Sequence, residues 1–135
     1  MLDLDILLDF IQKIKIKKSL SSKNEFSLCS YFLRRGNGCL DLKSLNLRGC
    51  TSIKSEGILR VLETCTKIAS LSVKLCEQLT DDAFALSKEL RLDHLTFLDL
   101  QGCTKLTDES LYCLTRAAPK LSFLDVRGFQ HLFFV

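Results

Sequence analysis

The sequence contains no tryptophan, one proline and six glycines among its 135 residues. So little proline and glycine excludes a collagen-like or low-complexity chain, and the 47% hydrophobic content excludes a disordered one. No run approaches the roughly 18 apolar residues that a membrane-spanning helix needs. The net charge of +3 is too small to indicate a nucleic-acid partner. What remains is a chain of one domain's length, able to bury a core without metal ions or disulfides.

The first residues of the chain are not ordered like a secretory signal. The stretch MLDLDILLDFIQKIK carries acidic residues among its leucines, and its lysines follow the apolar part instead of preceding it. The sequence has seven cysteines, an odd number that does not suit a closed disulfide framework. Both observations predict a cytoplasmic or nuclear protein with reduced thiols.

The sequence lacks the short motifs that mark common catalytic sites. It has no G-x-S-x-G, no phosphate-binding glycine loop, no H-E-x-x-H and no G-x-G-x-x-G fingerprint. Its two histidines, His94 and His131, keep no ligand spacing to the cysteines. We therefore expect a protein that is not an enzyme and that needs no cofactor or metal ion.

A repeat of about 26 residues organises the chain from about residue 40 onward. Four segments line up with one another: KSLNLRGC (43–50), ASLSVKLC (69–76), TFLDLQGC (96–103) and SFLDVRGF (122–129). Their central leucines are spaced by 26, 27 and 26 residues, at Leu45, Leu71, Leu98 and Leu124. The last residue of each segment keeps the same interval, at Cys50, Cys76, Cys103 and Phe129. Apolar columns that stay in register over such a length predict stacked structural units.

Each copy of the repeat changes its hydrophobic period once. The alternation Leu45-x-Leu47, which the other copies share, is the period of a strand with one buried face. The spacing then becomes helical, as at Ile58 and Leu62. The third helix should end before Pro119, because the residue preceding a proline disfavours the helical region. Helix starts, each with a capping residue and acids, are expected at Ser55-Glu56-Gly57, Thr80-Asp81-Asp82 and Thr107-Asp108-Glu109.

The pattern LxxLxLxxC, followed by a hydrophobic residue, Thr, Asp and a helix, resembles the cysteine-containing class of leucine-rich repeats. The third copy, LTFLDLQGCTKLTDESLYCLTRAAP, matches best. The second copy drifts after Phe84, where an extra residue and the stretch Lys88–Asp93 should disturb its helix. The resemblance implies an α/β leucine-rich-repeat solenoid over residues 39–135, with parallel β-strands on the concave face and helices on the convex face. About three and a half repeats fit, and the C-terminal copy is truncated.

The repeating cysteine lies where each strand ends and the chain turns inward. This position suits a small, largely apolar side chain that can still offer a weak donor to a buried carbonyl. Stacked copies would place Cys50, Cys76 and Cys103 roughly 4.8 Å apart, in a column and not around a pocket. Packing is therefore the main interpretation, and metal binding or redox chemistry is the alternative.

Residues 1–38 do not follow the repeat and are expected to form a separate helical segment. DILLDFIQKI (5–14) and FSLCSYFL (26–33) resemble the first helix and the second conserved stretch of a shortened F-box. A plain helical cap over the first repeat is the alternative. An F-box ahead of such repeats implies a substrate-recognition adaptor of an SCF-type (cullin–RING) E3 ubiquitin ligase, acting in ubiquitin-dependent protein degradation. Its contacts to a Skp-type linker protein would come from Leu7, Leu8, Ile11, Cys29 and Phe32.

The residues between the strand leucines should point to the concave face. They form three columns: Ser44, Ser70, Phe97 and Phe123; Asn46, Ser72, Asp99 and Asp125; Arg48, Lys74, Gln101 and Arg127. Phe97 and Phe123 beside Arg127 have the character of interface anchors, although such aromatics can also support their cross-strand neighbours. An aspartate column beside a basic column can also pair internally. The residues predicted to bind a target protein are Arg48, Lys74, Phe97, Asp99, Gln101, Phe123, Asp125 and Arg127.

Three features leave alternatives open. A lysine cluster between residues 13 and 23 fits a solvated helix end or, less well, an import or phosphate-binding patch. The sequence FQHLFFV follows the fourth strand where a helix and a cap would continue, which suits a fragment of a longer repeat protein, a truncated product or closure by a partner.

The function also has an alternative, which is a repeat protein without ligase coupling. We expect neither a membrane nor a nucleic acid as partner.

Overall fold

The computed structural model describes residues 43–51 and 53–130. The expectations for residues 1–38, the lysine cluster and His131 lie outside these ranges. The predicted linker contacts also lie outside them, at Leu7, Leu8, Ile11, Cys29 and Phe32. In the text below, repeat 1 is residues 43–68, repeat 2 is 69–95, repeat 3 is 96–121 and repeat 4 begins at 122.

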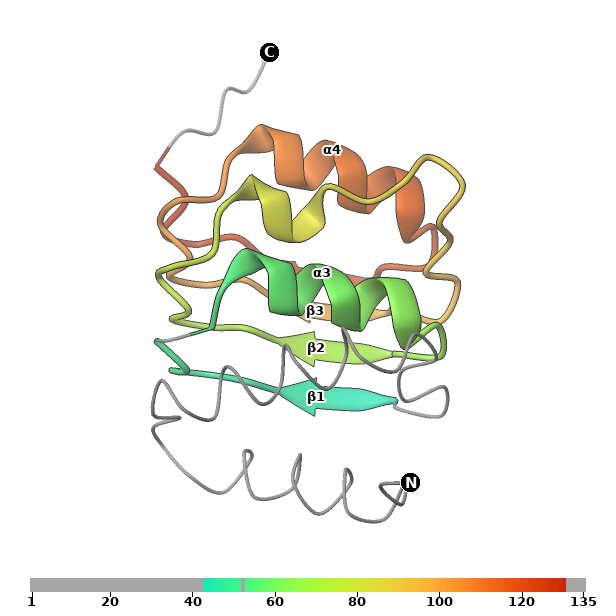
Figure 1. Cartoon of the computed structure of the whole chain (residues 1–135), viewed down its shortest axis with the longest axis horizontal. Coiled ribbons are helices and arrows are strands. Elements are labelled where there is room, and N and C mark those ends of the chain that lie inside the picture. Colours follow the sequence, from blue (N-terminus) through green and yellow to red (C-terminus); the bar gives the residue numbers. More distant parts are fainter. Residues whose placement is uncertain (1–42, 52, 131–135) are drawn as a thin grey trace.

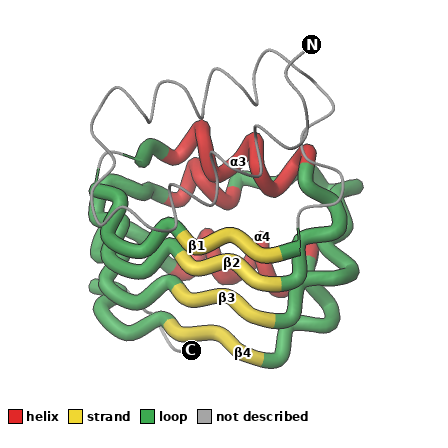
Figure 2. Tube along the Cα trace, turned by 90° about the horizontal axis from the view of Figure 1, so that it is seen from below, coloured by secondary structure: helices red, strands yellow, loops and turns green. Residues whose placement is uncertain are grey.

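The four leucine segments form one parallel sheet in chain order, β1-β2-β3-β4 (Figures 1 and 2). The strands are β1 (Ser44–Asn46), β2 (Ser70–Ser72), β3 (Phe97–Asp99) and β4 (Phe123–Asp125). Their register aligns Leu45 with Leu71, Leu71 with Leu98, and Leu98 with Leu124. The prediction that the repeating leucines occupy neighbouring parallel strands is therefore confirmed.

The segments that return from one strand to the next form a second layer on one face of the sheet (Figure 1). Repeat 1 returns through helix α3 (Ser55–Thr64) and repeat 3 through helix α4 (Asp108–Ala117). Helix α4 ends two residues before Pro119, as predicted. The described chain is thus an α/β structure in which each strand and the return after it form one level of a stack.

Repeat 2 differs from its neighbours because its return contains only a single 3-10 turn, η1 (Asp81–Phe84). The helix predicted to start at Thr80 is therefore only a single 3-10 turn. The predicted disturbance after Phe84 is confirmed, because the chain runs without helix from Ala85 to β3. The wholly buried Phe84 fills the space there. Repeat 3 holds the irregular stretch, because the Leu92 N–H donates to the Ala117 carbonyl at 2.8 Å and Arg116 Nη2 donates to the Leu86 carbonyl at 3.0 Å.

The predicted helix caps are confirmed at one start out of three. The Thr107 hydroxyl accepts a hydrogen bond from the Glu109 N–H at 3.3 Å, as an N-cap side chain should. Thr80 precedes η1 without a side-chain cap bond. Lys54, which has no capping side chain, precedes α3, so Ser55 is the first residue of that helix and not its cap.

The core lies between the sheet and the returning layer and is built from the repeating apolar columns. Leu45, Leu71 and Leu98 are at most 1% exposed. Their counterpart in the last strand, Leu124, is 36% exposed. Leu124 lies in β4, which pairs only with β3 and is followed by no further strand in the described part of the chain, so its leucine is less covered than those of β1 to β3.

Candidate functional site: the outer sheet face

The face of the sheet that is turned away from the helices presents three ordered columns of side chains, which we call the outer sheet face. Strand register aligns the first column and the second column as predicted: Ser44, Ser70, Phe97 and Phe123; Asn46, Ser72, Asp99 and Asp125. The third column consists of Arg48, Lys74, Gln101 and Arg127, in the turns that follow the strands. All eight residues predicted to contact a target lie in these columns.

Backbone hydrogen bonds continue the ladder beyond the strands and hold the third column in place. The carbonyls of Lys74, Gln101 and Arg127 each accept an N–H from the preceding repeat at 2.8 Å. The donors are Gly49, Leu75 and Gly102. The outer sheet face is therefore a fixed surface, on which side chains can bind a partner without first ordering the backbone.

Phe97 and Phe123 are neighbours in the first column and stack on each other. Their ring centroids are 4.4 Å apart and the ring planes differ by 5°. The cross-strand interpretation of these aromatics is thus confirmed for their mutual contact. The Phe123 side chain nevertheless stays 46% exposed, which leaves an aromatic surface open at the end of the sheet. The pair can serve as a pre-positioned anchor for a partner.

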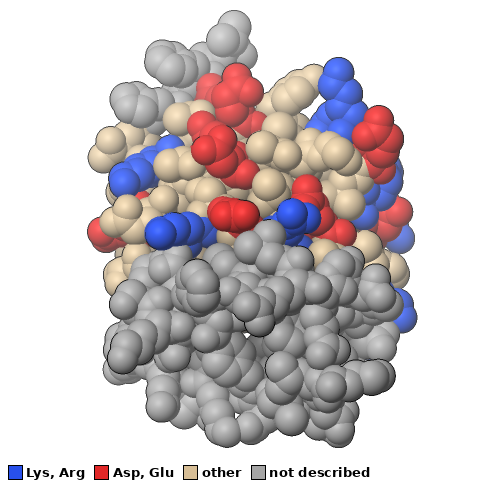
Figure 3. Space-filling view, in the orientation of Figure 1, with Lys and Arg blue, Asp and Glu red and all other residues tan. Residues whose placement is uncertain are grey.

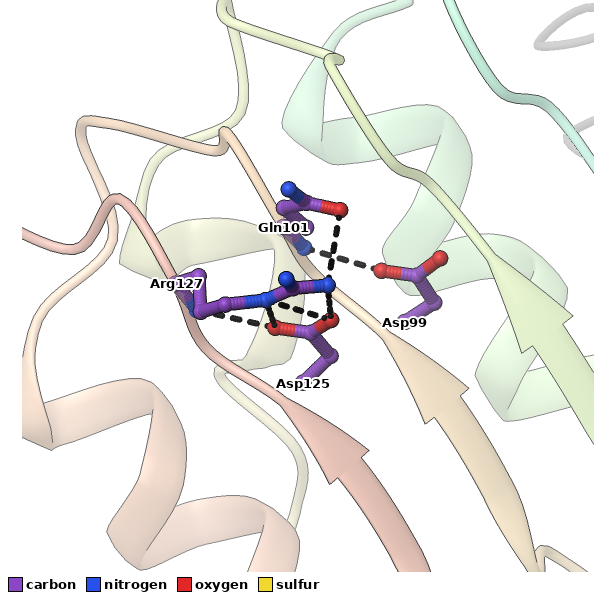
Figure 4. A network of polar contacts seen from close by, with 4 residues as sticks. All are labelled: Asp99, Gln101, Asp125 and Arg127. Atoms are coloured by element: carbon purple, nitrogen blue, oxygen red, sulfur yellow. Dashed lines mark hydrogen bonds and ion pairs between the residues drawn. The ribbon is translucent and has the colours of Figure 1, made fainter.

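Arg127 is the centre of a polar network beside this aromatic pair (Figure 4). Its guanidinium donates to both carboxylate oxygens of Asp125, with Nη2 to Oδ2 at 2.5 Å and Nε to Oδ1 at 3.0 Å. Nη2 also donates to Gln101 Oε1 at 3.2 Å. These hydrogen bonds lower the pKa of the Asp125 carboxyl to about 2 and raise the pKa of Arg127. The predicted internal pairing of the two columns is confirmed for this residue pair.

The carboxylate of Asp99 also has a structural contact, because its Oδ1 accepts the Gln101 N–H at 3.0 Å. Asp125 and Asn46 repeat this turn geometry: their Oδ1 atoms accept the N–H of Arg127 at 3.1 Å and of Arg48 at 3.0 Å. Asp and Asn favour such local bonds to the backbone two residues on. The second column therefore closes the turns after the strands as well as facing outward.

The repeating cysteines lie inside the stack and do not contribute to the outer sheet face. Cys76 Sγ donates to the Leu47 carbonyl at 3.2 Å, and Cys103 Sγ donates to the Val73 carbonyl at the same distance. The expected bond from thiol to buried carbonyl is confirmed for both. Burial raises the pKa of the Cys76 thiol well above its ordinary value and that of Cys103 to about 11. In the described ranges, no group of His, Cys, Asp and Glu side chains could hold a metal ion.

The sequence analysis missed one polar junction that links repeats 2 and 3. Asp81, interpreted only as an acid at a helix start, accepts hydrogen bonds from the Thr107 N–H at 2.9 Å, the Thr107 hydroxyl at 2.6 Å and the Ser110 hydroxyl at 2.5 Å. Its partial burial raises its pKa, but the bonds from Ser110 and Thr107 outweigh this and lower the pKa below its ordinary value. Ser55 bonds the Thr80 N–H at 2.9 Å in the same manner one repeat earlier.

A second missed feature is the turn after β2. Gly49, Gly102 and Gly128 adopt positive φ at this point of their repeats, and Leu75 occupies the equivalent position with φ 62°. A leucine in the left-handed region is strained, whereas glycine is not. The aligned segments RGC, KLC, QGC and RGF already carry this signal, because leucine interrupts a column of glycines. Leu75 is 40% exposed.

Figure 3 shows acidic and basic side chains intermixed over the described part of the helix side.

No helix in the described part of the chain has the length and apolar character needed to span a membrane.

Comparison with known proteins finds a family model that matches the repeat. The family model for leucine-rich repeats matches residues 38–61 and residues 92–114. The chain carries leucine-rich repeats. Such repeats form protein-interaction modules with extended binding surfaces. A chain in the crystal structure of the Rad7 and Elc1 complex in yeast is similar, with a TM-score of 0.68 and 23% sequence identity. The match covers 85% of this chain and 29% of that one, so this chain spans less than a third of its length.

Proposed function

We propose that this leucine-rich-repeat protein is a substrate-recognition adaptor of an SCF-type (cullin–RING) E3 ubiquitin ligase. Its outer sheet face holds the target protein, and its N-terminal residues 1–38 bind a Skp-type linker protein. The chain itself catalyses nothing, and it works in the cytoplasm or the nucleus. The observation that carries the proposal is the Phe97–Phe123 stack, exposed at Phe123, on the same fixed face as the Arg127 network.

The physical character of this face favours a protein target. Aromatic and arginine side chains are enriched among the residues that dominate binding energy at protein interfaces. Here a stacked aromatic pair lies on the adjacent strands β3 and β4, and a guanidinium follows in the turn after β4, where backbone hydrogen bonds between repeats hold the chain. A partner would not have to order them first, which lowers the entropy cost of binding.

The ligase half of the proposal has separate support. Residues 5–14 and 26–33 resemble the two conserved stretches of an F-box, and they precede the repeats. The crystal structure of the Rad7 and Elc1 complex supports the proposal to this extent: a protein with this fold occurs there in a complex with another protein. Binding to a Skp-type linker is the property that would separate an adaptor from other repeat proteins.

A pull-down with purified Skp-type linker protein tests the ligase half. We expect the full chain to bind the linker and the variants Leu8→Asp and Phe32→Asp to lose it, because a carboxylate would be buried in an apolar contact. Phe123→Ser, at the far end of the sheet, is the matched control and should bind the linker normally. Failure of the full chain to bind, or equal binding by all variants, would discard the adaptor role.

A capture experiment tests the target half. We expect proteins that co-purify with the full chain and with Tyr112→Ser to be lost with Phe123→Ser. Tyr112 is a suitable control because it is a 70% exposed aromatic in α4, on the other side of the molecule. If the capture does not depend on Phe123, the outer sheet face is not the target site. Target binding without linker binding would support the alternative, a leucine-rich-repeat binding protein without ligase coupling or a piece of a longer F-box/LRR protein.

A further inference from the structure

The two halves of the outer sheet face have different charge balances. Over β3 and β4, the second column supplies the carboxylates of Asp99 and Asp125, and Arg127 is paired to Asp125. Over β1 and β2, the same column supplies only Asn46 and Ser72. The cations of the third column in this half therefore have no acid beside them within their own repeats.

The two cations in question are Arg48 and Lys74. Neither forms an ion pair with another residue in the described part of the chain. Asp125 is attracted to Lys74, which contributes the last and smallest part of the lowering of its pKa. That carboxylate is already held by the guanidinium of Arg127 at 2.5 Å, so it does not neutralise the lysine. In the described part of the chain, the β1–β2 half therefore presents two cations that no carboxylate pairs with.

A hollow of about 260 Å³ lies over this half of the face. Arg48 and Lys74 line it together with the hydroxyl-bearing Ser70 and Ser72, and Phe97 forms an apolar part of its wall. The hollow is smaller than the roughly 300–1,000 Å³ of small-molecule pockets, so it suits one or two side chains of a protein segment. The Ser70 and Ser72 hydroxyls donate to nothing in the described ranges, which leaves them free to donate to an acceptor.

We infer that the β1–β2 half of the outer sheet face binds an acidic segment of the partner protein. Glutamate or aspartate side chains of that segment lie over Arg48 and Lys74 and accept hydrogen bonds from the serine hydroxyls, and an adjacent apolar side chain packs on Phe97. This inference rests on the proposed function and names the class of target segment. Asp99, which also borders the hollow, orients the segment by repelling its acids toward the β1–β2 side.

Charge complementarity identifies this occupant. Two cations of the third column and the serine hydroxyls of the first and second columns match carboxylates. The apolar wall formed by Phe97 matches a segment in which acidic and apolar residues alternate. A nucleic acid is disfavoured because phosphate binding relies on many basic contacts, and here the adjoining strands present carboxylates. Binding of an oligonucleotide is therefore a discriminating outcome of the test.

The test uses the full chain and a fluorescent ten-residue peptide with four glutamates and two leucines, followed by anisotropy. We expect Arg48→Gln with Lys74→Gln to weaken binding at least tenfold. The matched control, Lys105→Gln with Lys120→Gln, removes the same charge from two exposed lysines that do not line the hollow and should change binding less than twofold. Raising NaCl from 50 to 300 mM should weaken binding, because exposed charges are screened.

A glutamine version of the peptide separates charge from shape. If it binds as well as the glutamate peptide, or if the control double variant loses as much affinity as Arg48→Gln with Lys74→Gln, the inference is overturned. It is also overturned if oligothymidylate of equal length displaces the peptide at equal concentration. Loss of the acidic selectivity while Phe123-dependent target capture persists would reject this inference alone. Loss of both, together with no linker binding, would reject the proposed function.

Discussion

The two sides of the same four strands differ in how much their residues vary from one repeat to the next. On the inner side repeats 1 to 3 each place a leucine at the same level, and Leu45, Leu71 and Leu98 are all buried. On the outer side the aligned residues change from serine to phenylalanine and from asparagine and serine to aspartate. The inner positions are uniform because each must fill the same space between neighbouring levels. The outer positions do not fill that space, so their residues can differ between repeats.

The sharpest test of this comparison is truncation of one inner leucine. Leu98→Ala should lower the free energy of unfolding by about 2–5 kcal/mol, because it leaves a cavity in a fully packed layer. Leu124→Ala, at the aligned position of the last strand, should cost roughly 1 kcal/mol, since the leucine is already 36% exposed. Urea unfolding followed by circular dichroism measures both. Equal costs at the two sites would show that the last repeat is packed like the interior ones.

Substitution at the junction between repeats 2 and 3 should give the next largest change in the free energy of unfolding. Asp81→Asn should cost about 1–3 kcal/mol, because the carboxylate accepts three hydrogen bonds from Thr107 and Ser110. Asp82→Asn is the control, since Asp82 is exposed and lies beside Asp81 on the same turn. Chemical unfolding of the two variants at pH 7 provides the comparison.

The same pair of variants has an expected pH dependence. The folded state lowers the pKa of Asp81, so its contribution to stability is complete above its unfolded pKa of about 3.9 and is lost as the pH falls through the folded value. The stability difference between the wild type and Asp81→Asn should therefore shrink as the pH falls below about 4. A difference that stays constant down to pH 2 would mean that the carboxylate charge does not contribute.

Substitutions in the turn after β2 should change the free energy of unfolding by smaller amounts. Leu75→Gly should relieve the left-handed strain, offset by the greater unfolded-state freedom of glycine, and change stability by less than about 1 kcal/mol. Gly102→Ala should cost about 1–2 kcal/mol, because Gly102 has φ 77° and an added Cβ would lie 2.5 Å from Leu75 Cδ2. The double variant should cost less than the sum of the two single variants. Strict additivity in a double-mutant cycle would contradict the steric contact.

The smallest expected effect on stability comes from the outer network. Arg127→Gln should leave the unfolding midpoint nearly unchanged, because the arginine side chain is 72% exposed. The pKa of the Asp125 carboxyl should rise from about 2 toward its ordinary value, since the hydrogen bonds from Arg127 hold it down. NMR titration of that carboxyl measures the change. A pKa that stays near 2 would assign the shift to another group.

The sheet could be predicted from the sequence because both of its determinants are local and repeated. The alternation around Leu45, Leu71 and Leu98 set the strands, and the interval of about 26 residues set the register. The outward columns then followed from side-chain alternation alone. The bonds from Cys76 and Cys103 to buried carbonyls also followed, because the position needs a small side chain with a donor.

The single 3-10 turn of repeat 2 and the partners of Asp81 could not be predicted, because they depend on contacts between repeats that the pattern of one repeat does not contain. The sequence predicted that the return of repeat 2 is disturbed after Phe84, but not that its start at Thr80, Asp81 and Asp82 forms only a 3-10 turn. Asp81 looked like an acid for its own helix, but its partners belong to repeat 3. The sequence around Asp81 identifies it as a polar residue at a helix start, but its hydrogen-bond partners are determined by how repeat 3 stacks on repeat 2.

One measurement tests the division between the two sides most directly. The variant Arg48→Gln, Lys74→Gln, Phe123→Ser changes three outer residues at once, and its unfolding in urea can be compared with that of Leu98→Ala. We predict that the triple variant loses about 1 kcal/mol or less, as surface substitutions do, while Leu98→Ala alone loses more than twice as much. A triple variant less stable than Leu98→Ala would contradict the account, because the outer sheet face would then be part of what holds the repeats together.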